Sequence, residues 1–548
     1  MNILGITHPI SFNTAAAILV DGELVATAEE ERFNRIRYAP RMIPENAVKF
    51  VLKKANLKET DIDIIATSHN PATSYLNFPI NYLKGMFGNK HTPIHEIFWW
   101  MECGRMDVYL EKYLKTKFPN ARNNRVSHHL SHMASSVFFS GFKDTAFLTL
   151  DGRGEFESGL IGELKNNELD IFRSIKVQES LGIFYEEFTS LTGFRRHMDE
   201  GKVMGLAPYG KPIESLFKLV KVDKNYNIKI NWKELRRINA GQLTDDPTKD
   251  KRKDLAATGQ YLLEETALKL VEFLKESSNS KNICLAGGVA LNIDMNSRIL
   301  NSGHFDNIFI QPASSDAGCA LGAAAYTYFK ETGKSPKPEM EHAYWGAEYS
   351  NDEIEDVLKK LKIKNYTYLD SSQIPATVAD LIAKDNIIAW FQGRFELGPR
   401  ALGARSFLAN PSKESMWKIM NQVKGREYWR PLAPSMLEES TSDLLEKPHD
   451  SKFMLLSFKV RDDKAHLIPA VTHVDGTTRP QTVSKETNEL YWSTIKEFEK
   501  ISGIPVVINT SLNLRGDPIV NTPEDCIKTF FGSGTDNAII GNYILSKT

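Results

Sequence analysis

The chain contains 548 residues, enough for two large domains or three to four of ordinary size. Its 68 basic and 69 acidic residues give a net charge of −1, which argues against a nucleic-acid-coating protein or an electrostatic membrane binder. The four cysteines lack the paired spacing of a disulfide framework or a thiolate zinc site. No apolar run approaches the ~18 residues of a membrane helix, and the start lacks a signal-peptide pattern. We therefore expect a cytoplasmic protein without membrane insertion or a nucleic-acid partner.

The predicted strands open twice with the same pattern. Residues 2–7 and 15–20 are apolar, and Asp21-Gly22, a dipeptide typical of tight hairpins, joins the second run to an alternating segment. The plan recurs from Thr145, where residues 145–150 lead into Asp151-Gly152 and Asn166-Asn167 joins the next two runs. Helical patterns follow at residues 44–55 and 255–277. The recurrence predicts two similar α/β halves.

The remaining patterns predict an insertion and two further strands in the first domain, then a linker and a second domain. Residues 71–118 are rich in aromatic residues and are expected to form a looped and helical insertion. Residues 282–285 and 306–312 are expected to be strands, and residues 330–342, rich in Lys, Pro and Glu, are the best linker candidate. Beyond them, strand patterns occupy residues 386–392, 454–460 and 504–511, and helical patterns occupy residues 378–385 and 522–531. We place the domains at residues 1–347 and 348–548.

Four residues of the first domain form a candidate metal site. His128 and His132 lie at i,i+4, so on a helix both imidazoles point to one side. Asp151 ends an apolar strand, and Asp316 begins a helix of small residues. Two imidazoles and two carboxylates suit Fe²⁺, Mn²⁺ or Zn²⁺. Taken singly, each has a simpler explanation, as a polar helix face, a turn residue or a helix N-cap.

Glycine-rich connections in the first domain are candidate nucleotide-binding elements. Gly287 and Gly288 stand between a strand and a helix, with Asn292 one turn later, so the backbone could approach a phosphate closely. The segment of residues 199–212 adds Lys202 and Gly205. Steric accommodation and an ordinary charged surface turn are the competing interpretations.

The second domain predicts an anion pocket. Basic residues lie among glycine, proline and small polar residues in four segments, at residues 394–406, 422–436, 473–483 and 504–520. Arginine favours bidentate contacts with phosphate oxygens, and hydroxyls and strand-end amides complete such pockets. The alternative is a set of structural Arg–carboxylate pairs. The basic and small polar residues of these segments include Arg394, Arg400, Arg405, Lys424, Arg426, Arg430, His473, Arg479, Asn509, Thr510, Ser511, Asn513 and Arg515.

Together these motifs resemble the NodU/CmcH family of O-carbamoyltransferases over nearly the whole chain. The matching segments are AAAILVDGELVATAEEERFNRI, HHLSHMASSVFFS, LDGRGE, DEGKVMGLAPYG, LAGGVALN, SSDAGCALGAA, FELGPRALGARS, KGREYWRPLAPS, HVDGTTRPQTV and NTSLNLRGDPIV. The resemblance implies an α/β protein with a two-lobed actin/hexokinase-like (ASKHA) N-terminal domain. It also implies a YrdC-like α/β C-terminal domain.

The resemblance also implies functional residues. The family's metal motif falls on His128, His132, Asp151 and Asp316, with Fe²⁺ or another divalent transition metal expected. A Lys-x-Arg and Ser-x-Asn signature that binds ATP and the carbamoyl donor falls on Lys424/Arg426 and Ser511/Asn513. Lys424 and Arg430 are the expected catalytic residues there. Where relatives carry His-Asp before the second strand, this chain has Phe12-Asn13, and His8 is the candidate replacement base.

The expected reaction has two halves. Carbamoyl phosphate and Mg²⁺-bound ATP yield carbamoyl-adenylate, and a hydroxyl of a small-molecule or glycan acceptor then takes the carbamoyl group. The alternatives are an ASKHA-type kinase and a non-catalytic nucleotide-sensing regulator. Hydrogenase-maturation carbamoyltransferases are set aside because their zinc-finger cysteine motifs are missing. Residues 71–118 are the candidate determinant of the acceptor, and a homodimer is left open.

Overall fold

The computed structural model describes residues 1–73, 93–239, 241 and 244–547. The chain forms two compact units, the first of Met1–Asn34 and Tyr38–Met340, the second of Arg35–Arg37 and Glu341–Thr548. The break after Met340 lies inside the expected linker. Arg35 belongs to the second unit because its guanidinium donates to the carbonyls of Pro518 and Ile519, at 2.8 and 2.7 Å.

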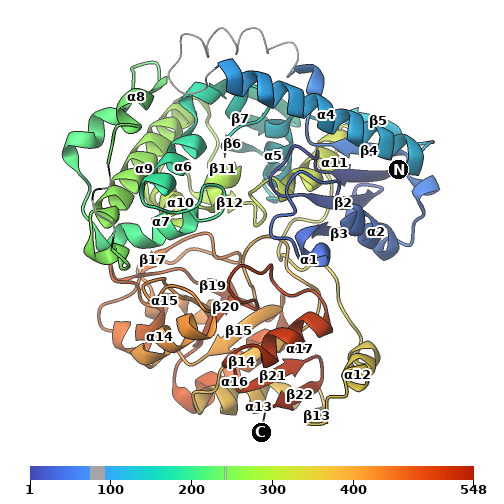
Figure 1. Ribbon diagram of the computed structural model, residues 1–548, viewed down its shortest axis with the longest axis vertical. Helices are drawn as coiled ribbons and strands as arrows, with labels where there is room; N and C mark the ends of the chain where they lie inside the picture. Colours follow the sequence, from blue (N-terminus) through green and yellow to red (C-terminus); the bar gives the residue numbers. More distant parts are fainter. Residues whose placement is uncertain (74–92, 240, 242–243, 548) are drawn as a thin grey trace. The chain divides into compact units, whose positions relative to one another are not determined.

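The first unit contains two five-stranded sheets with the same strand order (Figure 1). One has the order β3-β2-β1-β4-β5, with bounds Glu23–Glu29, Ala15–Val20, Asn2–Ile6, Ile64–Thr67 and Arg122–Arg125. The other has the order β12-β11-β6-β7-β8, with bounds Asn307–Ile310, Asn282–Ala286, Thr145–Leu150, Glu157–Lys165 and Glu168–Lys176. Each has its first strand at the centre. On one side two strands are joined by successive antiparallel pairings, and on the other side two strands are joined by parallel pairings. The predicted duplication is confirmed, as two lobes of one topology.

The hairpin turns that signalled this duplication have the expected backbone. Asp21 and Gly22 have φ of 50° and 84°, and Asn166 and Asn167 have φ of 52° and 61°. Two successive positive φ values define the turn whose twist matches antiparallel strands, and Asp, Asn and Gly adopt them at least cost. Local turn chemistry therefore sets the register of β2 with β3 and of β7 with β8.

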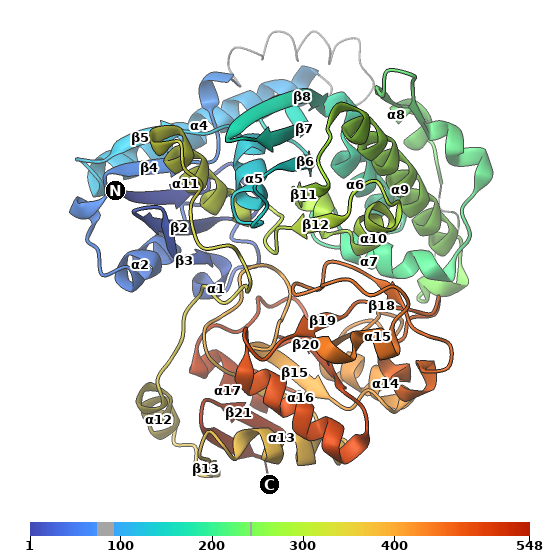
Figure 2. The same cartoon turned by 180° about the vertical axis from the view of Figure 1, so that it is seen from behind.

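Two helices of the first unit link its sheets. Helix α11 (Ala317–Thr332) packs on β1, β2 and β4, whereas α5 (His128–Val137) packs on β6, β7 and β11. The two helices also pack extensively on each other (Figure 2). Their shared face therefore lies where the two repeats meet within this unit. Shorter helices among the described residues of this unit include α1 (Glu31–Asn34), α2 (Glu45–Lys54), α6 (Leu181–Leu191), α7 (Glu200–Leu206), α8 (Trp232–Leu235) and α10 (Ile293–Asn301).

The two longest helices are α4 (Pro93–Lys117) and α9 (Arg252–Ser277). Helix α4 accounts for the C-terminal part of the expected insertion, while residues 74–92 lie outside the described residues. Helix α9 corresponds to the predicted amphipathic helix and packs on α6, α7 and α10. Across the described ranges, neither these helices nor any other is long and apolar enough to cross a bilayer.

The second unit is built on one eight-stranded mixed sheet of order β13-β22-β21-β14-β15-β20-β16-β19. The bounds in that order are Tyr366–Tyr368, Tyr543–Ser546, Asn537–Ile540, Ile388–Phe391, Arg405–Ala409, Val506–Ser511, Ala433–Leu437 and Gln481–Val483. Its helices are α12 (Asn351–Lys360), α13 (Ile374–Ala383), α14 (Glu414–Val423), α15 (Thr441–Leu444), α16 (Glu489–Ser502) and α17 (Pro523–Phe531). The α/β fold class is confirmed for both units.

One predicted strand of the second unit is wrong. Of residues 454–460, only Phe458–Lys459 form a strand, the short β17. Met454 has a φ of 56°, which turns the chain, yet Met454, Leu455 and Leu456 are all buried. The apolar run therefore reflects burial of an irregular segment, which periodicity alone does not distinguish from a buried strand.

Candidate metal centre and anion pocket

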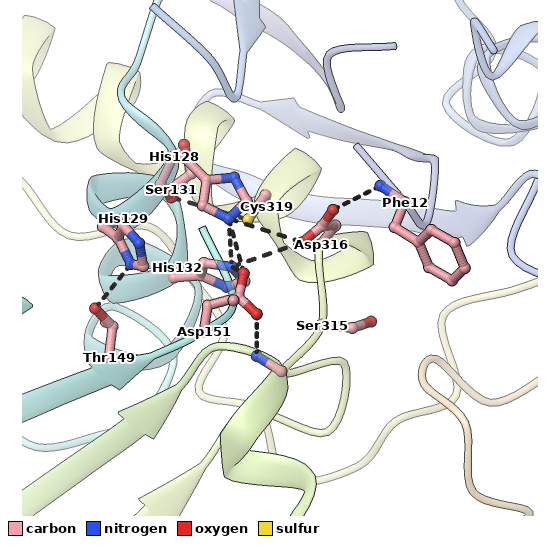
Figure 3. Close-up of polar contacts among 12 residues, drawn as sticks. Phe12, His128, His129, Ser131, His132, Thr149, Asp151, Ser315, Asp316 and Cys319 are labelled. Carbon is pink, nitrogen blue, oxygen red and sulfur yellow. Dashed lines mark hydrogen bonds and ion pairs between the residues drawn. The ribbon is translucent and has the colours of Figure 1, made fainter. Parts of the chain in front are cut away.

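Four side chains of the first unit converge at the face shared by α5 and α11 (Figure 3). His128 Nε2 lies 3.1 Å from His132 Nε2 and 3.0 Å from Asp151 Oδ2. The same carboxylate oxygen lies 3.3 Å from His132 Nε2, and Asp316 Oδ1 lies 3.7 and 3.9 Å from the two imidazoles. The structure thus brings together all four residues of the predicted metal set.

Each donor is held by its secondary structure. His128 and His132 occupy successive turns of α5, and Asp151 directly follows β6. Asp316 stands at the N-cap position of α11 but makes no side-chain cap bond. Its Oδ2 instead accepts the backbone N–H of Phe12 at 2.8 Å, which leaves Oδ1 directed at the histidines. Helix capping therefore does not explain this carboxylate.

Gly288 fixes the other carboxylate. Its backbone N–H donates to Asp151 Oδ1 at 3.2 Å, so Oδ2 turns toward the imidazoles. The preceding Gly287 has a φ of 92°, and a Cβ there would lie 2.1 Å from the carbonyl oxygen of Leu150. Only glycine fits both constraints at Gly287. In this structure the two glycines allow the backbone to pass close to Leu150 and Asp151.

The electrostatics of the cluster suit a cation. Burial opposes the charged form of His128, but the hydrogen bond to Asp151 and the charges of Asp316 and Asp151 outweigh it and raise its pKa to about 9. The pKa of Asp151 is lowered well below its usual value, because hydrogen bonds and charge from His128 and His132 exceed the effect of burial. Among the described residues, Nδ1 of the fully buried His132 finds no hydrogen-bond partner. Two imidazoles facing two carboxylates across such short distances form a donor set that fits a divalent transition metal.

Sequence reasoning missed the role of Glu155. Its buried carboxylate accepts the backbone N–H of His128 at 3.0 and 3.2 Å and that of Asn70 at 2.8 Å. Ser127, the N-cap residue of α5, makes no side-chain cap bond, so Glu155 anchors the N-terminus of the helix that carries both histidines. Burial raises the pKa of Glu155. The signal available in the sequence was the acidic residue at the end of LDGRGE, the segment in which Asp151 follows the strand.

His8, the candidate base, is completely buried. Its Nδ1 accepts the backbone N–H of Ile10 at 3.1 Å, and its Nε2 lies 3.7 Å from Asp107 Oδ1. The imidazole lies against His69, with ring centroids 4.8 Å apart. Burial lowers the pKa of His8, so the ring is neutral near pH 7, with Nε2 carrying the proton.

The remaining N-terminal candidates are dispersed. Lys202 on α7 forms an ion pair with Asp199 at 3.3 Å, and Gly205 lies on the same helix. Asn292 caps α10 by accepting the N–H of Met295 at 3.0 Å and also exchanges hydrogen bonds with Gln260. These contacts give Lys202 and Asn292 structural partners.

In the second unit, Lys424 lies at the centre of the candidate anion pocket. Its Nζ donates to Asn513 Oδ1 and to the carbonyl of Asn513, both at 3.0 Å, and it contacts the Ser511 carbonyl and hydroxyl. Burial, followed by the charges of Arg426 and Arg430, holds the pKa of Lys424 well below its usual value. Every hydrogen-bond partner that the described residues give this ammonium is a neutral oxygen. An anionic ligand would supply the missing countercharge.

The loop after α14 places the neighbouring arginines. Asn421 donates to the carbonyls of Tyr428 and Arg430, at 3.1 and 2.9 Å, and accepts from Arg426 Nε at 2.5 Å. Burial and the charge of Arg430 lower the pKa of Arg426. Farther along the chain, the charge of Arg479 acts on His473, whose pKa burial lowers to about 4.

Arg400 and Arg405 differ in their surroundings. Arg405 is fully buried, stacks 3.6 Å above the Phe391 ring and donates to the carbonyls of Gln392, Ala404, Ala347 and Gly393. Its guanidinium is therefore committed to the protein backbone. Arg400 stands in a loop organised by buried Glu396, which accepts the N–H groups of Leu402, Ala404 and Arg405 at 2.7–2.9 Å.

Comparisons with known proteins agree with these two units. The profile described as carbamoyltransferase N-terminus matches residues 2–325, and that described as carbamoyltransferase C-terminus matches residues 379–547. The chain is 35% identical to the nodulation protein NolNO of Sinorhizobium fredii, over 100% of this chain and 80% of that protein. It is 30% identical to the 3'-hydroxymethylcephem-O-carbamoyltransferase of Streptomyces clavuligerus, over 67% of this chain and 70% of that protein.

A solved structure of full-length HypF, in a phosphate- and nucleotide-bound form, covers 61% of this chain and 56% of its own at 12% identity. The TM-score of that match is 0.39. The two family profiles cover most of both units, and the match to NolNO spans the chain. The chain therefore belongs to the carbamoyltransferase family and is an enzyme of that class.

Proposed function

We propose that this carbamoyltransferase is ATP-dependent and transfers the carbamoyl group of carbamoyl phosphate, through carbamoyl-adenylate, to a hydroxyl of a small molecule or glycan. The observation that carries the proposal is the buried Lys424 ammonium, which is surrounded by neutral oxygens and by the charges of Arg426 and Arg430. Such a pocket favours a polyanionic ligand. The hydroxyl acceptor is supported by the relative named as an O-carbamoyltransferase of a hydroxymethyl compound.

We assign adenylate formation to the second unit. Carbamoyl phosphate is hydrolysed to carbamate and phosphate, and a carbamate oxygen attacks the α-phosphorus of Mg²⁺-bound ATP. The bond to the β-phosphate oxygen breaks, so pyrophosphate leaves and carbamoyl-adenylate remains. Lys424 and Arg430 stabilise the charge that develops on the phosphoryl oxygens, and Arg400, Arg426, Arg479, Ser511 and Asn513 bind the anions. Because four backbone carbonyls accept from the terminal nitrogens of Arg405, we propose that it supports the structure around this pocket.

We assign carbamoyl transfer to the first unit. The acceptor oxygen attacks the carbonyl carbon of carbamoyl-adenylate, the bond to the AMP oxygen breaks, and an O-carbamate forms. A divalent transition metal, Fe²⁺ in the first instance, would be held by His128, His132, Asp151 and Asp316, and would polarise the carbonyl. Lys202, Gly205, Gly287, Gly288 and Asn292 are the proposed nucleotide-facing residues, with Lys202 and Asn292 already engaged in the protein.

We propose His8 as the residue that receives the acceptor's proton. Asp107 faces Nε2, which favours the tautomer whose lone pair is on Nδ1 and would stabilise the imidazolium once formed. That lone pair is bound by the N–H of Ile10, so proton transfer requires this hydrogen bond to break when the acceptor binds.

An assay of products tests the proposal. The purified enzyme, supplied with ATP, Mg²⁺ and carbamoyl phosphate, should exchange labelled pyrophosphate into ATP only when carbamoyl phosphate is present. With an acceptor alcohol it should release AMP. Formation of ADP with a phosphorylated acceptor would instead identify a kinase. Failure to turn over ATP with carbamoyl phosphate and acceptor present would overturn ATP-dependent transfer.

A further inference from the structure

The two histidines of the candidate metal centre belong to a second donor set. Side-chain donor atoms of His128, His132 and Cys319 all lie within 4.8 Å of one another, and all three residues are buried. This set shares both imidazoles with the His–Asp set but exchanges the carboxylates for a sulfur (Figure 3). Thiolate is a soft ligand, whereas carboxylate is a hard one.

The packing of α5 and α11 fixes the sulfur beside the imidazoles. Asp316 and Cys319 are three residues apart at the start of α11 and so lie on the same side of this helix. One turn later, Gly322 faces α5, where an added Cβ would lie 1.7 Å from the carbonyl oxygen of Ser131 and 2.9 Å from the amide nitrogen of Ser135. The helices therefore meet backbone to backbone, and only glycine permits this approach.

Cys319 makes one weak contact through its thiol. Its side chain has no exposed surface, and its Sγ lies 3.9 Å from the carbonyl oxygen of His128, the limit of a weak thiol hydrogen bond. In the same cluster, the part of the chain that the structure describes gives the buried Nδ1 of His132 no hydrogen-bond partner. The site thus combines a thiol held against two imidazoles with a buried ring nitrogen that the protein does not satisfy.

We propose that Cys319 is a third soft donor, so that thiophilic divalent ions such as Cd²⁺ bind through His128, His132 and Cys319, while harder ions use the two aspartates. The inference rests on the proposed metal centre. Formation of the metal–sulfur bond displaces one proton from Sγ to solvent, and no oxidant or reductant is required. The consequence is that soft ions occupy the centre with a different geometry and compete with the working metal.

The test uses the full-length protein loaded with Cd²⁺, whose nearest atoms are identified by X-ray absorption at the cadmium edge. The wild type should show one sulfur neighbour, and Cys319→Ser and Cys319→Ala should show only nitrogen and oxygen neighbours while remaining folded. Cys284→Ser is the matched control, because Cys284 is also buried in this unit, with Sγ 3.4 Å from Thr145 Oγ1, and its variant should keep the sulfur signal.

The outcomes separate this inference from the metal centre itself. Stoichiometric Cd²⁺ with nitrogen and oxygen neighbours alone in the wild type would overturn the role of Cys319 and leave the His–Asp site standing. A wild-type protein that binds no Cd²⁺ would also overturn the role of Cys319. A sulfur signal that persists in both Cys319 variants would assign the thiolate to another cysteine and would equally overturn the proposal.

Discussion

Gly288 stands against Asp151 so closely that a Cβ at this position would lie 2.8 Å from Oδ1 of the carboxylate. The same oxygen accepts the Gly288 N–H, so this backbone both directs and confines the side chain. Hydrogen-bond partners behind a metal ligand commonly change affinity when they are altered, because they set the orientation of the ligand. The glycine pair is thus part of the candidate metal centre.

Gly288→Ala should weaken metal binding by about tenfold or more, because the added methyl group displaces the Asp151 carboxylate. Metal affinity measured by competition with a chelator checks this, and circular dichroism checks that the fold is kept. Gly201→Ala is the control, since a Cβ at that position on α7 meets nothing within 4 Å. Unchanged affinity in Gly288→Ala would contradict the role of this glycine in orienting Asp151.

His132→Ala should remove the metal from the first unit. The imidazole is fully buried, and its Nε2 lies 3.1 Å from that of His128, so the variant loses a donor at the centre of the set. Elemental analysis of the purified protein measures the metal content. His304→Ala, which changes a histidine outside the set in the same unit, should keep the metal. Full occupancy in His132→Ala would contradict the assignment.

Much of this arrangement could be predicted because its signals are local. The Asp21-Gly22 and Asn166-Asn167 turns reveal the repeat, since their positive φ values depend on the dipeptides themselves. The His128–His132 pair follows from helix periodicity. Residue types in one short segment are enough for both predictions.

The contacts that complete the sites are tertiary and could not be predicted in the same way. Glu155 reaches the N-terminus of α5, and Gly322 meets Ser131, only because β6 and α11 pack on α5. Arg405 shows a second reason why the sequence alone is not enough. Its motif resembles a ligand-binding arginine, yet folding surrounds its guanidinium with backbone carbonyls. One sequence does not reveal whether an arginine's partners are ligand or protein.

His8→Gln should slow carbamoyl transfer by about a hundredfold, the usual contribution of a general base. Because burial lowers the pKa of His8 below 6.5, the neutral form that accepts a proton prevails above that pH and is lost as the pH falls through the lowered pKa. The wild-type rate should therefore decline on the acidic side with a midpoint below pH 6.5, and this limb should vanish in the variant. Retention of the limb would exclude His8 as the base. Metal content and pyrophosphate exchange should be unaffected.

Lys424→Met should separate the two half-reactions. Methionine keeps much of the length of the side chain but removes the ammonium that contacts Ser511 and Asn513. Loss of this charge from a buried phosphoryl site should cost on the order of 3 kcal/mol, about a hundredfold in the carbamoyl-phosphate-dependent exchange of pyrophosphate into ATP. Lys418→Met, which changes an exposed lysine on α14, the helix that precedes Lys424, should behave as the wild type.

The same Lys424→Met protein should still carbamoylate an acceptor when carbamoyl-adenylate is supplied, because the His–Asp cluster of the first unit is unaltered. His132→Ala should behave in the opposite way, exchanging pyrophosphate normally while failing to transfer the carbamoyl group. This reciprocal pattern is expected only if Lys424 serves activation and His132 serves transfer. If both variants remain folded and lose both half-reactions to the same extent, activation and transfer share one site, and the assignment of separate roles to the two units is wrong.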